Sequence, residues 1–222
     1  MSNPLLQAKE IEVIKGGAAI LNTISVAIHA GSAHVIMGHN GAGKTMLLYA
    51  LHGLVEIASG SREMTAGLGQ KLVFQKPVLL RRSAAAHFAF ASGITARADM
   101  MAWFHKADLA DKCDVPARQL SAGEQQKLAL ISALATQPDI LFLDEPTANL
   151  DRDSTKAIEA MITAAKQDGT ALVMVSHSVS QAKRLADRIW YLEEGQLCDD
   201  EEAAAFFGGT HSAQADRFLA ET

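Results

Sequence analysis

The chain has 222 residues, of which 49% are hydrophobic and 20% charged, and its formal net charge is −5. This length is enough to bury a sizeable core and fits one domain with room for an inserted subdomain. The acidic balance and the absence of lysine and arginine blocks disfavour non-specific nucleic-acid binding, which needs a basic face to release phosphate counterions, so we expect no nucleic-acid partner.

Neither a secretory leader nor a membrane span is expected. Residues 1–4 carry no basic patch followed by an apolar stretch. No window reaches the roughly 20 apolar residues needed to cross a bilayer. The most apolar stretch, 84–94, is short and contains His87, Ser92 and Gly93. We therefore expect a cytoplasmic protein that is held at the inner face of the cell membrane through a partner.

The first half of the chain contains strands that lead into a glycine-rich loop and a helix. Apolar residues recur at every second position near the N-terminus, which is typical of half-buried strands. Glycine and serine together mark a turn. In chain order, the patterns predict strands at 11–13, 24–28, 35–37 and 72–74, a helix at 44–54 and a turn at 59–61.

The second half alternates helices with short apolar strands. Helices are predicted at 123–136 and 153–166, and strands at 140–143, 171–175 and, as the last one, 188–192. Ser178 and Gln181 predict a capping box that starts a further helix. Strands that alternate with helices indicate a mostly parallel α/β sheet. The alanine- and methionine-rich segment 77–119 has no strand pattern and predicts a helical insertion on one side.

A phosphate-binding loop is predicted between the strand at 35–37 and the helix that follows. Gly38-His39-Asn40-Gly41-Ala42-Gly43-Lys44-Thr45 matches the pattern G-x-x-x-x-G-K-[ST] in this strand-to-helix context. Glycines let backbone amides curl around phosphates, and the helix presents its positive end. Lys44 would reach the β- and γ-phosphates, and the Thr45 hydroxyl would bind Mg²⁺. The alternative, a glycine-rich turn with an incidental lysine, does not explain this context.

Two acids end the apolar strand at 140–143. Asp144 and Glu145 lie at its carboxyl end, which in an open α/β sheet is beside the phosphate loop. Asp144 would hold the Mg²⁺ shell, and Glu145 would polarise the attacking water as a general base. Alone, the pair would read as a solvated loop start. Together with the phosphate loop, it predicts nucleoside triphosphate hydrolysis.

A third motif, Leu120-Ser121-Ala122-Gly123-Glu124-Gln125-Gln126, lies just upstream of this strand. It resembles the signature motif of ATP-binding cassette (ABC) proteins, usually written LSGGQ. The other elements of that family occur in the family's order. Gln75 resembles the Q-loop glutamine, residues 148–151 the D-loop, and His177 the switch histidine. Six ordered motifs are far more specific than one, and the resemblance extends from about residue 9 to about 220.

The resemblance implies a fold and an assembly. The fold is that of a P-loop NTPase of the ABC type: one nucleotide-binding domain over 1–222, with a parallel core sheet, an antiparallel β subdomain and a helical subdomain inserted at about 77–135. Family members work as head-to-tail pairs, and each ATP meets the phosphate loop of one subunit and the signature loop of the other. Ser121 and the amides around Gly123 start a helix, so they would form that second anion site.

Roles for single residues also follow from the resemblance. Catalysis would use Glu145, His177 and Lys44, with His177 at the γ-phosphate. Mg²⁺ would be held, partly through water, by Thr45, Gln75 and Asp144, and Asp151 would connect the two sites of the dimer. The residues expected around ATP are Gly38, Asn40, Gly41, Ala42, Gly43, Lys44, Thr45, Met46, Gln75, Asp144 and Lys15, with Ser121 and Gly123 facing the ATP of the partner subunit.

Three positions depart from the family pattern. Lys15 stands where an aromatic ring usually stacks on adenine, and its methylenes could lie on the base instead, so we expect a weak preference for adenine over guanine. Ala122 replaces the first signature glycine, and its Cβ is tolerable unless φ must be positive. Ser132 stands where an arginine often follows. Neither of the latter touches a catalytic group, so we expect an active ATPase.

Sequence similarities outside the core motifs indicate the type of transporter. Residues 73–83 and the tail segments 206–207 and 217–219 resemble the ATPases of bacterial tungstate importers, which are related to those for phosphate and polar amino acids. We expect a single cassette without the C-terminal regulatory domain of sugar-importer ATPases. The implied partners are a second copy of the chain, integral membrane permease subunits and a solute-binding protein.

Segment 77–83 is apolar and basic, and it is placed to receive a coupling helix of the permease. The alternative is ordinary core with Arg81 and Arg82 at a solvated edge. Two other functions stay open. One is the ATPase of another single-cassette transporter, such as a phosphate or amino-acid importer or an exporter. The other is a soluble ABC protein that acts on nucleic acid or in iron–sulfur assembly.

Overall fold

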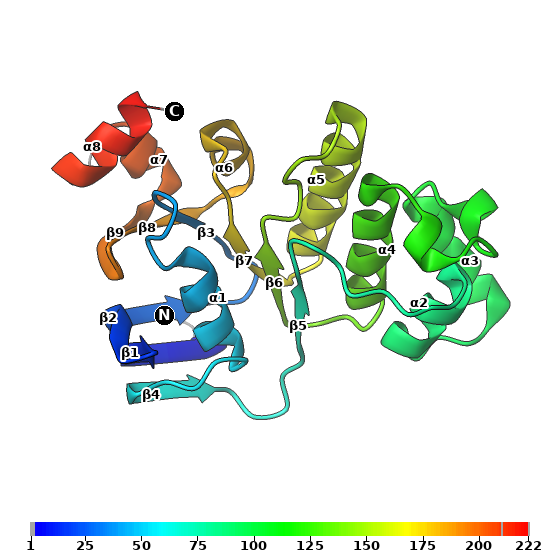
Figure 1. The fold of residues 1–222 in the computed structure, drawn as a ribbon, viewed down its shortest axis with the longest axis horizontal. Coiled ribbons are helices and arrows are strands. Elements are labelled where there is room, and N and C mark those ends of the chain that lie inside the picture. The colour runs from blue at the N-terminus through cyan, green and yellow to red at the C-terminus, as the bar shows by residue number, and fades with distance from the viewer. Residues whose placement is uncertain (1–2, 210, 222) are drawn as a thin grey trace.

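The computed structural model describes residues 3–209 and 211–221, and it contains two sheets flanked by helices (Figure 1). One sheet has six strands in the order β5-β6-β7-β3-β8-β9, and the other has three in the order β2-β1-β4. The elements are β1 (Leu6–Lys15), β2 (Ala18–Ile28), β3 (Ala33–Met37), α1 (Lys44–His52), β4 (Ser59–Met64), β5 (Gln70–Val73), α2 (Ala84–Ser92), α3 (Arg97–Lys106), α4 (Ala122–Leu134), β6 (Ile140–Asp144), α5 (Arg152–Gln167), β7 (Ala171–Val175), α6 (Val179–Leu185), β8 (Arg188–Glu193), β9 (Gln196–Glu202), α7 (Ala203–Phe207) and α8 (Ala213–Ala220).

The six-stranded sheet carries the centre of the molecule. Every residue of β3, β6 and β7 is buried, as expected for parallel strands covered on both faces. Neighbours from β5 to β8 pair in parallel, and β9 pairs antiparallel with β8. The predicted α/β fold with a mostly parallel sheet is confirmed. The prediction that 188–192 is the last strand is wrong, because the largely acidic β9 has no apolar pattern to indicate it.

The three-stranded sheet is antiparallel, and it corrects a second prediction. Residues 59–61, predicted as a turn, begin β4, where Ser61 pairs with Lys9 of β1 and Ser59 with Glu12. Serine and glycine locally favour turns, but pairing with β1 overrides this local preference. The apolar faces of β1 and β2 pack with α1 and with one face of the central strands in a single core cluster.

The helical part between β5 and β6 has a core of its own. Residues from Leu79 to Ile131, contributed by α2, α3, α4 and their connections, form a separate buried cluster that includes Phe88 and Phe104. This part lies at one end of the molecule, away from the three-stranded sheet (Figure 1). The predicted helical character of 77–119 holds for α2, α3 and two short 3₁₀ turns, but residues 77–83 form no helix. Ser83 caps α2 instead.

The capping box predicted at the start of α6 forms only in part. Ser178 accepts a hydrogen bond from the Gln181 amide, as predicted. The Gln181 side chain does not return the bond to the Ser178 backbone. It accepts from the Ser176 hydroxyl and donates to the Thr147 hydroxyl and to Glu159. Because Gln181 is buried, its amide is satisfied across three elements rather than within its own helix.

His34 on β3 makes the stability of the fold sensitive to acid. Its ring lies 4.4 Å from that of Trp190, and it is only 2% exposed. Burial, reinforced by the positive charges of Arg188 and His29, lowers the pKa of His34 to about 3. The folded chain therefore keeps this ring neutral at pH values where the unfolded chain takes up a proton.

We expect the free energy of unfolding to fall below about pH 6.5, by up to about 1.4 kcal/mol per pH unit from this group. His34→Phe keeps a ring against Trp190 and removes the titration. Urea denaturation at pH 7.5 and 5.0 measures both proteins, and the wild type should lose about 2 kcal/mol more than the variant. Equal losses in the two proteins would show that His34 does not titrate in this way.

Candidate functional site

The predicted phosphate loop joins the buried end of β3 to the start of α1. Gly38 has φ 143°, and a Cβ there would lie 2.1 Å from the Leu192 carbonyl oxygen, so a side chain could enter only if β8 moved. Gly43 occupies the N-cap of α1, and no side chain in the described part of the chain caps the helix. The first amides of α1 are therefore available to an anion, and the helix dipole favours negative charge there.

Lys44 lies inside this loop. Its Nζ donates to the carbonyl oxygens of Gly38 and His39, both at 2.8 Å, and the residue is buried. Burial lowers the pKa of Lys44, while the nearby carboxylates of Glu145 and Asp144 act in the opposite direction. The ammonium group is thus held by two neutral carbonyl oxygens next to the loop amides, and it can transfer those hydrogen bonds to negatively charged phosphate oxygens.

Thr45 and Asp144 supply oxygen ligands for a divalent cation. The Thr45 hydroxyl donates to Asp144 Oδ1 at 3.0 Å, and Asp144 is 4% exposed. Hydroxyl and carboxylate oxygens suit Mg²⁺, which usually binds one or two carboxylates together with substrate phosphates. No group of three or more His, Cys, Asp or Glu side chains that could hold a metal occurs among the described residues. The donor set therefore fits Mg²⁺ that arrives with a nucleotide better than a self-contained metal centre.

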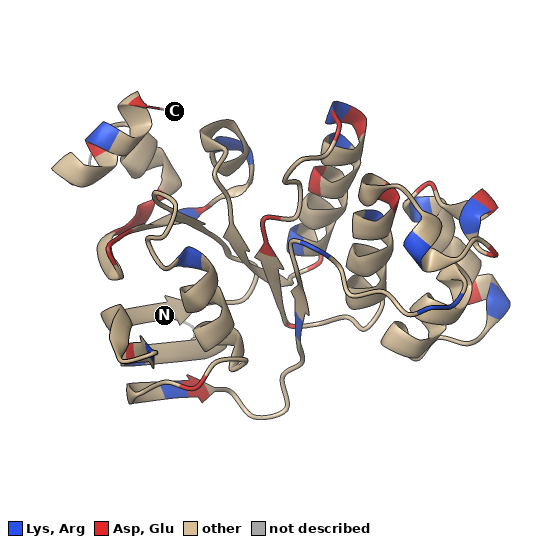
Figure 2. Ribbon diagram, in the orientation of Figure 1, with Lys and Arg blue, Asp and Glu red and all other residues tan. Residues whose placement is uncertain are grey.

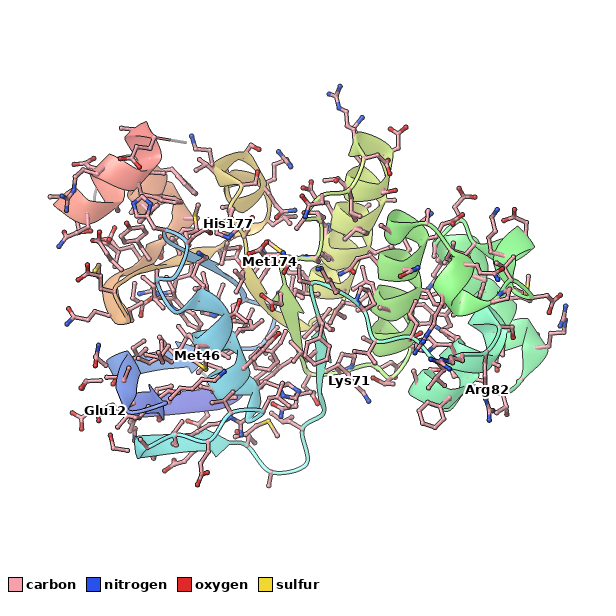
Figure 3. All side chains as sticks on the ribbon, viewed as in Figure 1. Glu12, Met46, Lys71, Arg82, Met174 and His177 are labelled. Carbon is pink, nitrogen blue, oxygen red and sulfur yellow. The ribbon has the colours of Figure 1, made fainter. Side chains whose placement is uncertain are left out.

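Glu145 connects two of the other predicted residues. Its Oε2 accepts from Gln75 Nε2 at 2.8 Å, and its Oε1 lies 2.7 Å from His177 Nε2. The backbone of Glu145 has φ 45°, and its amide donates to Val175 O at the end of β7. Strained non-glycine backbone of this kind is concentrated at functional sites. His177 follows the carboxyl end of β7, on which Met174 lies (Figure 3).

The strand order explains why these residues meet. β5, β6, β7 and β3 are successive neighbours, and their carboxyl ends share one edge of the sheet. Lys44 and Thr45 begin α1 just beyond the loop after β3, and the loops after β5, β6 and β7 supply Gln75, Glu145 and His177 in that order. A cluster at the carboxyl edge of an open parallel sheet is the usual location of a nucleotide site.

Four predicted ATP contacts lie outside this cluster. Lys15 is exposed at the end of β1, where it pairs with Ala18. Met46 lies on α1 and packs partly into the core beneath the three-stranded sheet. Ser121 and Gly123 start α4, which is separated from α1 by β5 and β6 (Figure 1). Within one chain, the signature segment and the phosphate loop therefore do not form a single pocket.

The signature segment nevertheless forms a well-defined helix start. Ser121 caps α4 and makes a reciprocal capping box with Glu124. Ala122 is the first helical residue and has no positive φ, so the expectation that its Cβ is tolerated is confirmed. At Gly123, an added Cβ would lie 2.3 Å from Ser154 Oγ and 2.8 Å from Ser154 Cβ. Close packing against α5 in the same chain thus leaves no room for a side chain at the second signature glycine.

Two further residues that act on the cluster are not predicted from the sequence. Tyr49 donates to Asp144 Oδ2 at 2.9 Å, and burial together with this bond raises the pKa of Tyr49, which keeps its hydroxyl protonated. The sequence signal that could have identified Tyr49 is its position four residues after Thr45, which places both side chains on the same face of one helix. Gln126 of α4 donates to the Phe74 carbonyl, beside Gln75, at 3.3 Å. No local pattern indicates that contact, because 52 residues separate its partners.

The described residues also enclose a cavity of about 510 Å³ away from this cluster, between α3, α4 and α5. Its walls include Trp103, Lys106 and Met161, and it opens near the amino ends of β6 and β7. The phosphate loop and the catalytic candidates are at the opposite edge of the sheet. The cavity therefore takes no part in the chemistry of the cluster.

Comparisons with known proteins give a consistent family. The sequence profile described as "ABC transporter" matches residues 21–148. The chain is 34% identical to the tungstate uptake system ATP-binding protein TupC of Peptoclostridium acidaminophilum, over 86% of this chain and 94% of that protein. It is 30% identical to the phosphate import ATP-binding protein PstB 2 of Natronomonas pharaonis, over 91% and 82%. A solved ATP-binding subunit of an ABC transporter shares the fold, with TM-score 0.84, 20% identity and 98% of each chain covered.

Proposed function

Because the chain belongs to the ABC transporter family, as an ATP-binding and ATP-hydrolysing subunit, we propose that it powers the import of an oxyanion, with tungstate as the substrate. The observation that carries the ATPase part is the meeting of Lys44, Thr45, Asp144 and Glu145 at one sheet edge. The tungstate part rests on the resemblance of residues 73–83 and on the similarity to the tungstate uptake protein.

The proposed chemistry assigns one task to each group in the cluster. The phosphate loop, residues 38–45, binds the triphosphate through its amides, and Lys44 neutralises the β- and γ-phosphates. Thr45 and Asp144, with Gln75 through water, would hold Mg²⁺, and the bound ion would supply positive charge for the phosphates. Glu145 accepts the proton of the attacking water, and His177, already on Glu145 Oε1, orients the γ-phosphate.

The proposed working unit is a homodimer with ATP between its subunits. Ser121 and Gly123 lie apart from the phosphate loop of their own chain, while the start of α4, which is exposed at Ser121 and Ala122, presents a positive helix end. We assign this surface to the ATP of the second copy. Asp151 caps α5 by accepting hydrogen bonds from the Ser154 amide and hydroxyl, and both residues lie next to Gly123. We propose that this position couples Asp151 to the ATP site that Gly123 shares with the second subunit.

A surface for the permease is proposed on the helical part of the single domain, over about 77–135. Family subunits pair with membrane permeases, and no described helix of this chain is long and apolar enough to span a membrane. Val78 is 78% exposed and Phe90 75%, and Arg81 and Arg82 are exposed beside Val78. Figure 3 shows Arg82 on this part, and Figure 2 shows basic residues there in short stretches rather than in one block. Exposed apolar side chains with a basic border suit a coupling helix.

The remaining proposed partners and location follow from this arrangement. A solute-binding protein would deliver the oxyanion to the permease, because an ATPase on the inner face would not reach the far side of the membrane. The subunit would be cytoplasmic and peripheral on the inner face of the cell membrane. Importers of phosphate and of polar amino acids are the nearest alternatives, since the phosphate import relative matches 91% of the chain and the tungstate relative 86%.

Tungstate uptake in a strain without this gene tests the substrate. We expect uptake to be lost on deletion, to return with the wild-type gene and to stay absent with Glu145→Gln. Uptake of phosphate should be unchanged in all strains. Normal tungstate uptake in the deletion strain would exclude this substrate, and loss of phosphate uptake instead would identify the alternative.

Lys15 leads to a prediction about the base. It is exposed at the tip of the β1–β2 hairpin and offers methylenes but no ring. We expect ATP and GTP to be hydrolysed with kcat/KM values within about threefold of each other. Lys15→Tyr should raise the kcat/KM of ATP hydrolysis about tenfold, because stacking of a base on a ring is worth about 1–3 kcal/mol, and GTP should gain similarly. Steady-state kinetics with both nucleotides measures this.

The matched control is Lys9→Tyr, which adds the same ring at an exposed position on the same strand. It should leave the kcat/KM of ATP and of GTP hydrolysis unchanged. If Lys15→Tyr and Lys9→Tyr behave alike, Lys15 does not lie at the base.

A further inference from the structure

Two hydroxyl groups on α1 hold the two oxygens of one buried carboxylate. Thr45 Oγ1 donates to Asp144 Oδ1 at 3.0 Å, and Tyr49 donates its hydroxyl to Asp144 Oδ2 at 2.9 Å. Residues four apart lie on the same face of a helix, so α1 presents both hydroxyls to the end of β6. The two hydroxyls differ in position, because Thr45 belongs to the phosphate-loop motif and Tyr49 lies one helical turn further along α1.

Tyr49 also contacts the segment that leads to Gln75. Its ring lies edge-on to the ring of Phe74, with 5.9 Å between centroids. Phe74 immediately precedes Gln75, whose amide donates to Glu145 Oε2 at 2.8 Å. The side chain of Tyr49 is partly buried, so both its hydroxyl and its ring are fixed by neighbours. Tyr49 therefore contacts both Asp144, the proposed cation ligand, and Phe74, the residue before Gln75.

The two hydroxyls are not equivalent once a cation binds. The proposed function assigns the Thr45 hydroxyl to Mg²⁺, and an oxygen that binds Mg²⁺ directs its lone pair to the metal. Asp144 is 4% exposed, and a buried carboxylate oxygen without a donor costs about 1–3 kcal/mol or more. The Thr45 hydroxyl keeps its proton when its lone pair binds the metal and can still donate to Oδ1, so the Tyr49 hydroxyl is the donor that holds the other oxygen, Oδ2.

We propose that Tyr49 is a positioning residue for the cation site, which orients the Asp144 carboxylate through its hydroxyl and fixes the Gln75 segment through its ring. This inference rests on the proposed Mg²⁺ site and deepens it. Donors behind a metal ligand hold its orientation, and their loss typically weakens metal affinity about 10–100-fold. A tyrosine that merely fills space would lose stability on mutation but would leave the preference for a metal-bound nucleotide unchanged.

The test uses Tyr49→Phe, which removes one oxygen atom and keeps the ring on Phe74. Calorimetric titration measures the affinity of the purified protein for a non-hydrolysable ATP analogue, once with Mn²⁺ and once with EDTA. The ratio of the two affinities is the contribution of the metal and does not depend on turnover. Tyr191→Phe is the control, because its buried hydroxyl donates to the Gln214 carbonyl instead.

We expect the wild type and Tyr191→Phe to bind the Mn²⁺-loaded analogue more tightly than the metal-free analogue, with equal ratios. In Tyr49→Phe the ratio should fall about tenfold, while the affinity for the metal-free analogue stays within about twofold. The Mg²⁺ concentration that gives half-maximal ATP hydrolysis should rise by a similar factor. Thermal denaturation of all three proteins reports whether folding is preserved.

Three outcomes would overturn the assignment. An unchanged ratio in Tyr49→Phe would show that its hydroxyl does not act on the cation. Equal weakening of metal-bound and metal-free binding would show a purely structural role. A wild type that binds the analogue equally well with and without Mn²⁺ would remove the cation site itself, and with it the role of Tyr49, while leaving nucleotide binding in place.

Discussion

Glu145→Gln is expected to lower ATP turnover by about two to four orders of magnitude, the usual contribution of a general base. The amide keeps the shape of the side chain, so its contacts with Gln75 and His177 can persist in altered form. It cannot accept a proton from water. Nucleotide affinity should stay close to that of the wild type, because the phosphate loop is untouched. Phosphate release and fluorescent-nucleotide binding measure the two quantities separately.

Glu12→Gln provides the matched control for this experiment. Glu12 lies on β1, where it accepts from the Thr23 hydroxyl, far from His177 (Figure 3). The same chemical change there should leave turnover unaltered. If Glu145→Gln retains turnover within about threefold of the wild type, a group other than Glu145 activates the water.

Gly123→Ala is expected to lower the free energy of unfolding by about 1–3 kcal/mol and to reduce ATP turnover at least tenfold. The added methyl group would lie 2.3 Å from Ser154 Oγ and 2.8 Å from Ser154 Cβ, so α4 and α5 must separate at their starts. That movement also displaces the amides proposed to meet the ATP of the second subunit. Urea denaturation and steady-state hydrolysis measure the two effects.

Ala122→Gly is the neighbouring control. Ala122 is exposed and helical, so restoring the family glycine should cost no more than about 1 kcal/mol and leave turnover near the wild-type value. Combining Gly123→Ala with Ser154→Gly makes room for the methyl group and should recover part of both losses. A Gly123→Ala protein with wild-type stability would show that the helix starts yield at little cost.

The buried strands and the phosphate loop could be predicted because their signals are local. The unbroken apolar runs 35–37, 140–143 and 171–175 lie within β3, β6 and β7, and the loop after β3 has fixed glycine spacing. β4 and β9 could not, because Ser-Gly-Ser favours a turn and an acidic segment has no apolar alternation. β4 is a strand because it pairs with β1, and β9 because it pairs with β8. These backbone hydrogen bonds outweigh the weak strand preference of the two segments.

By itself the sequence determined the chemistry available to this protein: a triphosphate-binding loop, a carboxylate pair at a strand end and a signature helix start. Only the tertiary structure decided which of these groups meet. Gln75, Glu145 and His177 are far apart along the chain and come together because β5, β6 and β7 are neighbours with their carboxyl ends at one edge. The same order brings Tyr49 to Asp144 and leaves Ser121 apart from the phosphate loop. A local sequence pattern indicates whether a segment forms a helix or a strand. Contacts between distant side chains depend instead on the order of the strands, which is set by long-range strand pairing and burial of the core.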